Sequence, residues 1–277
     1  MNNVKTAEEG NRLIETYLEG NEPFYVGRIG ITEMQTMYHF LGNRDIPNSM
    51  KMDLHHTGFY GDCFPEFCAE YMESLRTANI HVYWEHLDGA SQQNLFQTNA
   101  KNAILVKNRS VEPFCFENPW SYALRGKRIL VVHPFVESIS HQYKNRENLW
   151  KNDRILPKFE LITYKSVQSL FNNETQSYPH TSWIESLNAM KNDISNLDFD
   201  VALLGCGSYG MPLSSFIKTD LKKSSIYIGG GLQLLFGIKG SRWDGHEYSK
   251  YYNNYWSRPL VRETPDSYKN MENGAYW

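Results

Sequence analysis

An arginine and a glutamate flank the second glycine of the segment FYVGRIGITEM, residues 24–34. Residues 24–26 are apolar and β-prone, whereas the residues from Ile31 onward have helical spacing, so Arg28 lies in the turn between a strand and a helix. Glu33 falls in the first turn of that helix, where backbone N–H groups and the helix dipole favour negative charge. The segment predicts an anion site in which Arg28 supplies positive charge, and Glu33 either binds a divalent cation that bridges to phosphates or acts as a base toward an acceptor hydroxyl. The alternative is that Glu33 is a helix-capping acid exposed to water.

Three more turns that suit a ligand follow predicted strands. They are His133-Pro134, Gly205 to Gly207 and Gly229 to Gly231. In a doubly wound sheet, ligands bind beyond the carboxyl ends of the strands, and glycine there lets the backbone approach a ligand and turn its N–H groups toward an anion. Together with Gly27 and Gly30, these turns predict a phosphate or diphosphate ligand. The alternative for each turn is that glycine only permits a tight bend.

Two other positions have side chains suited to this ligand. His133 follows a predicted strand and is a candidate for contacting the ligand or acting as a base, or else for a structural hydrogen bond. Arg242 and Trp243 follow a glycine-containing loop. The arginine could pair with phosphate, and the tryptophan could stack on a base or sugar or belong to the core.

Several familiar motifs are weak or missing. Residues 205–210 match GxGxxG, but no acidic residue follows the next predicted strand to hold a ribose hydroxyl, so the match is weak evidence for NAD. The chain contains neither GxxxxGK[ST] nor GxSxG, which argues against a P-loop nucleotidase and a nucleophile-elbow hydrolase. The four cysteines include no CxxC pair, and His55 and His56 would point to opposite sides if extended, so a zinc site is not favoured.

Strand and helix patterns alternate along the chain. A first helix begins at the capping box Thr6 to Glu9 and ends at Gly20. The predicted strands are residues 24–26, 80–84, 128–132, 159–164, 201–204 and 225–228. The later predicted helices are residues 31–41, 65–78, 91–102, 137–150, 183–194, a helix starting near 211, and 232–236. Residues 47–62 are rich in turn formers and are predicted to be a loop. This alternation predicts an α/β fold with a doubly wound, mostly parallel sheet.

Composition and charge narrow the class of protein. The 277 residues, 41% of them hydrophobic, predict one domain over residues 1–277. Residues 244–277 are so rich in Tyr and Trp that we expect a C-terminal extension packed on that domain or covering an acceptor site. A net charge of −3 gives no overall positive field for nucleic acid. No 18-residue apolar run and no signal-peptide pattern are present, which predicts a cytoplasmic protein without a membrane span.

The residues from Arg28 to Glu33 resemble the Arg-any-Gly-Asp-Gly-Glu turn of the GT-D type bacterial glycosyltransferases. Further similarities, from about residue 23 to the C-terminus, are His133-Pro134-Phe135, Gln142-Tyr143, Arg146, ALLGCGSYGMPL, GGGLQLLFGIKGSRW and ENGAYW. The resemblance implies a Rossmann-like fold and transfer of a sugar from a nucleotide donor, usually a UDP-sugar, in the assembly of bacterial surface polysaccharides or glycoconjugates. In that family an Asp-any-Glu pair is associated with the metal and the donor diphosphate. Ile31 replaces the first acid here, so only Glu33 matches, and dependence on manganese or magnesium stays open.

The resemblance and the turns together define the candidate residues. Glu33 and His133 are the candidate catalytic residues, and Glu33 is also the candidate metal ligand. The candidate donor-binding residues are Arg28, Gly30, Gly205, Gly207, Tyr209, Gly229, Gly230, Gly231, Gln233 and Arg242. The acceptor would be a glycan or a lipid-linked glycan, which is compatible with peripheral membrane association. Two alternatives remain: a noncatalytic nucleotide-sugar-binding module, which Ile31 permits, and a dinucleotide-dependent oxidoreductase, which would bind NAD.

Overall fold

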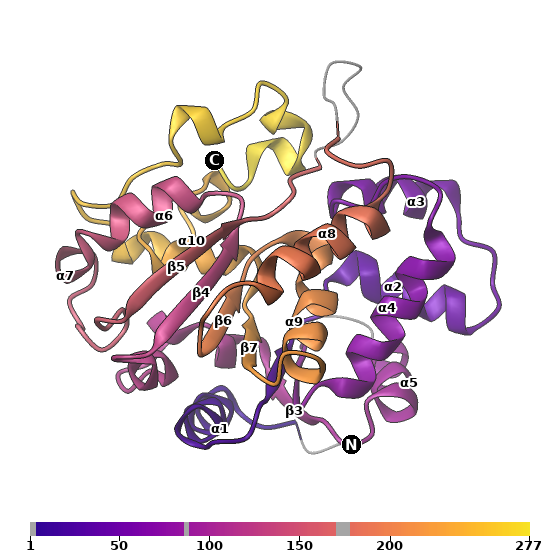
Figure 1. The fold of residues 1–277 in the computed structure, drawn as a ribbon, viewed down its shortest axis with the longest axis horizontal. Coiled ribbons are helices and arrows are strands. Elements are labelled where there is room, and N and C mark those ends of the chain that lie inside the picture. Colours follow the sequence, from indigo (N-terminus) through magenta and orange to yellow (C-terminus); the bar gives the residue numbers. More distant parts are fainter. Residues whose placement is uncertain (1–3, 86–88, 170–177) are drawn as a thin grey trace.

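The structure is a computed structural model that describes residues 4–85, 89–169 and 178–277. Its centre is a sheet of seven parallel strands in the order β3-β2-β1-β7-β6-β4-β5 (Figure 1). The strands are β1 (Tyr25–Gly27), β2 (Ile80–Tyr83), β3 (Ile104–Lys107), β4 (Arg128–His133), β5 (Glu160–Lys165), β6 (Val201–Leu204) and β7 (Ser224–Tyr227). The predicted α/β fold with a Rossmann-like, doubly wound parallel sheet is confirmed.

Helices cover both faces of the sheet. One face carries α2 (Ile31–Leu41), α3 (Asn48–His56), α4 (Phe64–Thr77), α5 (Gly89–Asn99), α8 (Trp183–Ser195) and α9 (Gly210–Thr219). The other face carries α1 (Ala7–Glu19), α6 (Val136–Tyr143), α7 (Arg146–Leu149), α10 (Leu232–Leu235) and the C-terminal extension, which is yellow in Figure 1. Two separate hydrophobic clusters fill the two interfaces, as a doubly wound sheet requires.

The chain leaves neighbouring central strands toward opposite faces of the sheet. β1 and β6 continue into α2 and α9 on one face, whereas β7 and β4 continue into α10 and α6 on the other. Because these strands are adjacent in the order β1, β7, β6, β4, each neighbouring pair of connections diverges. A crevice opens beyond the carboxyl ends of parallel strands wherever their connections diverge, and it is the usual ligand site of such folds.

Local signals explain most of the element boundaries. α1 begins at the predicted capping box, in which the Glu9 N–H donates to Thr6 Oγ1 at 3.2 Å and the Thr6 N–H donates to Glu9 Oε2 at 2.9 Å, and it ends at Gly20. α2 has the predicted bounds and ends before Gly42. All four residues of β6 are buried, which is typical of a central parallel strand with helices on both faces.

The predicted loop at residues 47–62 is wrong, because α3 lies within it. Pro47 precedes the first turn of α3 with φ −57°, so it starts this helix instead of marking a turn. Only Leu54 is buried in α3, so apolar spacing gave no helical signal. His55 and His56 therefore lie in the last turn of a helix and not in an extended segment.

Two other elements differ from the prediction. The helix predicted for residues 137–150 is divided into α6 and α7, since Asn145 leaves helical geometry with φ −101° and ψ 15°. β3 is missing from the predicted strands. It is an edge strand of four residues. It is stabilised by pairing with β2 and by a β-bridge between Lys5 and Val106, which local sequence patterns do not reveal.

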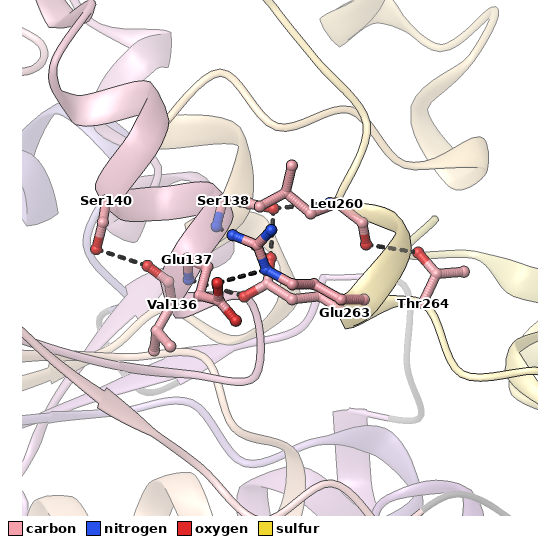
Figure 2. Close-up of polar contacts among 8 residues, drawn as sticks. Val136, Glu137, Ser138, Ser140, Leu260, Glu263 and Thr264 are labelled. Atoms are coloured by element: carbon pink, nitrogen blue, oxygen red, sulfur yellow. Dashed lines mark hydrogen bonds and ion pairs between the residues drawn. The ribbon is translucent and has the colours of Figure 1, made fainter.

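The C-terminal extension has buried aromatic side chains in the same hydrophobic cluster as α1, α6 and α10. The indole N–H of Trp256 donates to the Leu149 carbonyl at 2.9 Å. Figure 2 shows a second attachment, in which the Glu263 carboxylate accepts hydrogen bonds from the backbone N–H groups of Glu137 at 2.8 Å and Ser138 at 3.0 Å. A carboxylate at this position accepts hydrogen bonds from the first turn of α6 and interacts favourably with the positive end of the helix dipole. Among the described helices, none is long and apolar enough to cross a membrane.

Candidate active site

A cavity of about 430 Å³ lies at the carboxyl ends of the central strands. It is lined by residues that follow five adjacent strands: Arg28 after β1, Gly230 after β7, Gly205 after β6, His133 at the end of β4 and Ser166 after β5. The last residues of the C-terminal extension, including Tyr276 and Trp277, also line it. The cavity therefore occupies the crevice that the diverging connections create.

Most of the predicted site residues line this cavity. They are Arg28, Gly30, Glu33, His133, Gly205, Gly207, Tyr209, Gly230, Gln233 and Arg242. Gly229 and Gly231 are not part of the lining. Gly229 lies directly behind it, because a Cβ atom at Gly229 would come 2.5 Å from a terminal nitrogen of Arg28.

Arg28 is held in place from two sides. Its Nε donates to Asn108 Oδ1 at 3.0 Å, and its guanidinium carbon lies 4.4 Å from the ring centroid of Trp84. The Trp84 indole is fixed in turn by a hydrogen bond to the Ile29 carbonyl at 2.9 Å. Among the described residues, the Arg28 guanidinium forms no ion pair within 4 Å, so its terminal nitrogens can bind an anionic ligand.

Glu33 is buried, with 5% of its surface exposed, so the alternative of a water-exposed capping acid is wrong. Its carboxylate folds back over Gly30, where a Cβ atom would come 2.1 Å from Glu33 Oε2. The aromatic residues Tyr71 and Tyr227 surround it. The glycine at the start of α2 thus makes room for this carboxylate as well as for a tight turn.

The environment of Glu33 makes its carboxylate more basic. Burial raises the pKa of Glu33, while its own backbone N–H, the Arg28 charge and the Tyr71 hydroxyl act in the opposite direction. The net rise in the pKa means that desolvation outweighs these three contributions. A carboxylate with a raised pKa accepts a proton more readily, which suits a general base.

His133 is a neutral hydrogen-bond donor. Only 3% of its surface is exposed, and burial lowers its pKa to about 3. Its Nδ1 accepts the backbone N–H of Phe135 at 3.0 Å, so the proton of the neutral ring resides on Nε2. Because neither ring nitrogen then has a free lone pair, His133 is better placed to donate to a ligand than to act as the base.

Two of the glycines are required by protein packing. Gly207 has φ +58°, and a Cβ atom there would come 2.5 Å from the Thr57 carbonyl oxygen. At Gly230 a Cβ atom would come 2.4 Å from the ring of Tyr276. The absence of a side chain at these two glycines lets Thr57 and Tyr276 pack against the strand ends. This is a structural reason for glycine, independent of ligand binding.

Arg242 belongs to the wall that the C-terminal extension forms. It is ion-paired with Glu272, and its Nη1 donates to the Tyr276 hydroxyl at 3.0 Å. About 42% of the Arg242 side chain is exposed, so it has more freedom than Arg28. Trp243 is buried in the core and does not line the cavity.

The sequence prediction missed several lining residues. Trp84 directly follows β2, and Ser166 to Ser169 directly follow β5. The available signal was position alone, since every residue just after a parallel strand is a candidate for the ligand side of the sheet. Gln142, which the resemblance singled out, is buried elsewhere and donates to the carbonyls of Gly237 and Tyr255.

The lining contains few ligands for a divalent cation. Among the described residues, its carboxylates are those of Glu33 and Glu272, and Glu272 is already paired with Arg242. Across the part of the chain that the structure describes, no group of three or more His, Cys, Asp or Glu residues could hold a metal ion. Magnesium at a phosphate site is usually held by one or two carboxylates together with the phosphates and water, so Glu33 is the lining carboxylate on which metal binding would depend.

The cavity thus combines a buried acid, a neutral histidine and an arginine that forms no ion pair among the described residues. Comparison with protein-family models, with curated proteins and with solved structures finds no match for this chain.

Proposed function

We propose that the chain is a glycosyltransferase that moves a sugar from a nucleoside diphosphate sugar, with a UDP-sugar as the first choice, to a hydroxyl group of a glycan acceptor. The observation that carries the proposal is the combination, in one strand-end cavity, of the buried Glu33 carboxylate and the Arg28 guanidinium, which forms no ion pair among the described residues. Sugar transfer needs a base for the acceptor and positive charge for the leaving diphosphate.

The proposed ligand contacts follow from the charges in the cavity. Arg28 would bind the diphosphate through its terminal nitrogens, since its Nε is engaged by Asn108. His133 would donate through Nε2 without adding charge. Arg242 lines the same cavity and would approach the same phosphates, at the expense of its pair with Glu272. Such preorganised donors stabilise charge as it develops on the leaving group.

In the proposed reaction, Glu33 takes the proton of the acceptor hydroxyl as the acceptor oxygen forms a bond to the anomeric carbon of the donor sugar. The bond between that carbon and the diphosphate oxygen breaks, and its electron pair leaves with the diphosphate. Arg28 and His133 bind the departing oxygens. The raised pKa of Glu33 supports the role of base over that of metal ligand, and no step here requires a metal.

A second candidate is a noncatalytic nucleotide-sugar-binding module. Two observations favour it: Glu33 Oε2 lies over its own helix start at Gly30, and the position of the family's other acid is occupied by Ile31, which is 38% exposed. Such a module would use the same cavity and the same positively charged side chains, Arg28 and Arg242. It would bind the donor but release no nucleoside diphosphate.

Calorimetric titration with UDP, UDP-glucose, GDP-mannose and NAD, with and without manganese, tests the proposal. We expect a UDP compound to bind best, and Arg28→Gln to weaken its binding by about 10-fold or more, because hydrogen bonds to charged groups contribute about 1.5–3 kcal/mol. Arg12→Gln, at an exposed position of α1, is the control. Release of UDP in the presence of an acceptor would separate the transferase from the binding module. Preferential binding of NAD, or no binding of any nucleotide, would refute both.

A further inference from the structure

The lining of the cavity extends along the sheet. Besides Trp84 after β2, it includes residues at the ends of β1, β7, β6, β4 and β5, and there are four steps between neighbouring strands from β1 to β5. Neighbouring strands lie about 4.8 Å apart, so the row of strand ends spans roughly 19 Å. An elongated ligand would therefore contact chemically different residues at its two ends.

The charged side chains of the lining are concentrated at one end of this row. Arg28 and Glu33 follow β1, and Arg242 and Glu272 adjoin Tyr276, which packs on Gly230 after β7. Within the described part of the chain, the lining after β5 and α3 has no Asp, Glu, Lys or Arg. The end at β1 and β7 is therefore suited to the anionic part of a ligand, whereas the end at β5 is suited to a neutral part.

The neutral end of the cavity contains several hydroxyl groups. Thr57, Ser166, Ser169 and Tyr209 all line it. Gly58 brings the segments together, because a Cβ atom there would come 3.1 Å from Ser169 Oγ and 3.7 Å from the ring of Tyr209. Thr57 and Ser169 already donate to protein carbonyls, those of Leu54 and Gly58. Their hydroxyl oxygens can still accept hydrogen bonds.

The Ser166 hydroxyl forms no hydrogen bond within the described part of the protein. Only 3% of the residue is exposed, and among the described residues its Oγ has no hydrogen-bond partner. The Ser166 N–H lies 3.4 Å from the His133 carbonyl, so Ser166 directly adjoins the strand that carries His133. A buried hydroxyl without a partner costs free energy, and a ligand that pairs with it recovers that cost.

We propose that the end of the cavity at β5 is the subsite for the donor sugar ring, and that Ser166 and Tyr209 bind hydroxyl groups of that ring. This inference rests on the proposed function, because it places the diphosphate near Arg28 and His133 and lets the sugar extend toward β5. The neutral, hydroxyl-lined wall matches a polyhydroxylated ring that carries no charge. Ser166 would thus help to determine which sugar is accepted.

The test compares binding of UDP with binding of UDP-sugars. Calorimetric titrations with UDP, UDP-glucose, UDP-galactose and UDP-N-acetylglucosamine give the ratio of Kd for the best sugar nucleotide to Kd for UDP. We expect Ser166→Ala and Tyr209→Phe each to raise this ratio by about 3- to 10-fold, the effect of one lost hydrogen bond, with Kd for UDP unchanged.

Matched controls separate this effect from altered packing. Ser110→Ala removes a buried serine hydroxyl that likewise has no partner among the described residues, and Tyr252→Phe removes such a tyrosine hydroxyl; neither residue lines the cavity. Both controls should leave the ratio unchanged. If UDP binds but the ratio does not change in Ser166→Ala and Tyr209→Phe, or if UDP and UDP-sugar weaken equally, the sugar subsite is refuted while the proposed function stands. If the wild-type protein binds no nucleotide, both are refuted.

Discussion

Replacing Glu33 by glutamine should change stability and turnover in opposite directions. Glu33→Gln keeps the size of the side chain and removes its charge. The dipole of α2 stabilises the negative charge of Glu33 by about 0.3–1 kcal/mol. Burial nevertheless raises the pKa of Glu33, which means that desolvation destabilises the carboxylate by more than its own backbone N–H, Arg28 and Tyr71 stabilise it. We therefore expect the variant to have a larger free energy of unfolding than the wild type at neutral pH.

The dependence of this gain on pH follows from the direction of the shift. An unfolded glutamate has a pKa of about 4.3, and the folded value of Glu33 is higher. Between these two values the folded state binds more protons than the unfolded state, so the wild type loses stability as the pH rises through this window. Each unit of pKa difference corresponds to about 1.4 kcal/mol. The advantage of Glu33→Gln should be absent below the unfolded pKa and complete above the folded pKa.

Turnover should fall by about 100-fold or more in the same variant if Glu33 is the general base. The assays are urea denaturation from pH 3.5 to 8 and release of UDP from the best-binding UDP-sugar with acceptor. Glu185→Gln is the matched control, because Glu185 is an exposed acid in the first turn of α8 whose pKa is lowered by hydrogen bonds from Thr181. Removing the Glu185 charge in Glu185→Gln should destabilise the protein at neutral pH and should have no effect at pH values below the lowered pKa of Glu185. A Glu33→Gln protein that is less stable at pH 7 and turns over normally would refute our reasoning, since it would identify Glu33 as a simple capping acid.

Three further expectations concern the rest of the site. His133 should stay neutral from pH 5 to 8, because burial lowers its pKa to about 3; a histidine ring signal assigned by its loss in His133→Asn and titrating in this range by NMR would contradict that. Gly207→Val should lower the free energy of unfolding by roughly 1–2 kcal/mol from positive φ alone, and more from contact with Thr57, whereas Gly231→Ala, whose Cβ atom would lie 3.9 Å from Ile228 Cγ2 in ordinary contact, should cost less in the same urea titration. Glu263→Ala should cost about 1–3 kcal/mol by leaving N–H groups of α6 unpaired; equal stability of Glu263→Ala and the exposed-site variant Glu147→Ala would show that this cap contributes nothing.

Local signals determined much of the fold. The capping box at Thr6 fixes where α1 begins, and Gly42 marks the end of α2, because the free backbone groups at helix ends need specific partners that neighbouring residues provide. The apolar run of β6 is typical of a central strand. Such features depend on a few consecutive residues, so they could be predicted from the sequence, as could the position of glycine turns after strands. α3 and β3 could not, since α3 buries only Leu54 and β3 depends on its pairing with β2.

The chemistry of the site depended on tertiary structure. The sequence identified Glu33 as an acid at a helix start, but its raised pKa arises because residues from other elements, including Tyr71 of α4 and Tyr227 of β7, bury it. Likewise, the sequence alone allows His133 to act as a base, but burial and the hydrogen bond from the Phe135 N–H keep its ring neutral, with the proton on Nε2. Burial and hydrogen-bond partners are properties of packing between distant segments, and no local pattern encodes them. The sequence thus determined which side chains stand at the strand ends, whereas only the packed structure decided the protonation state of each.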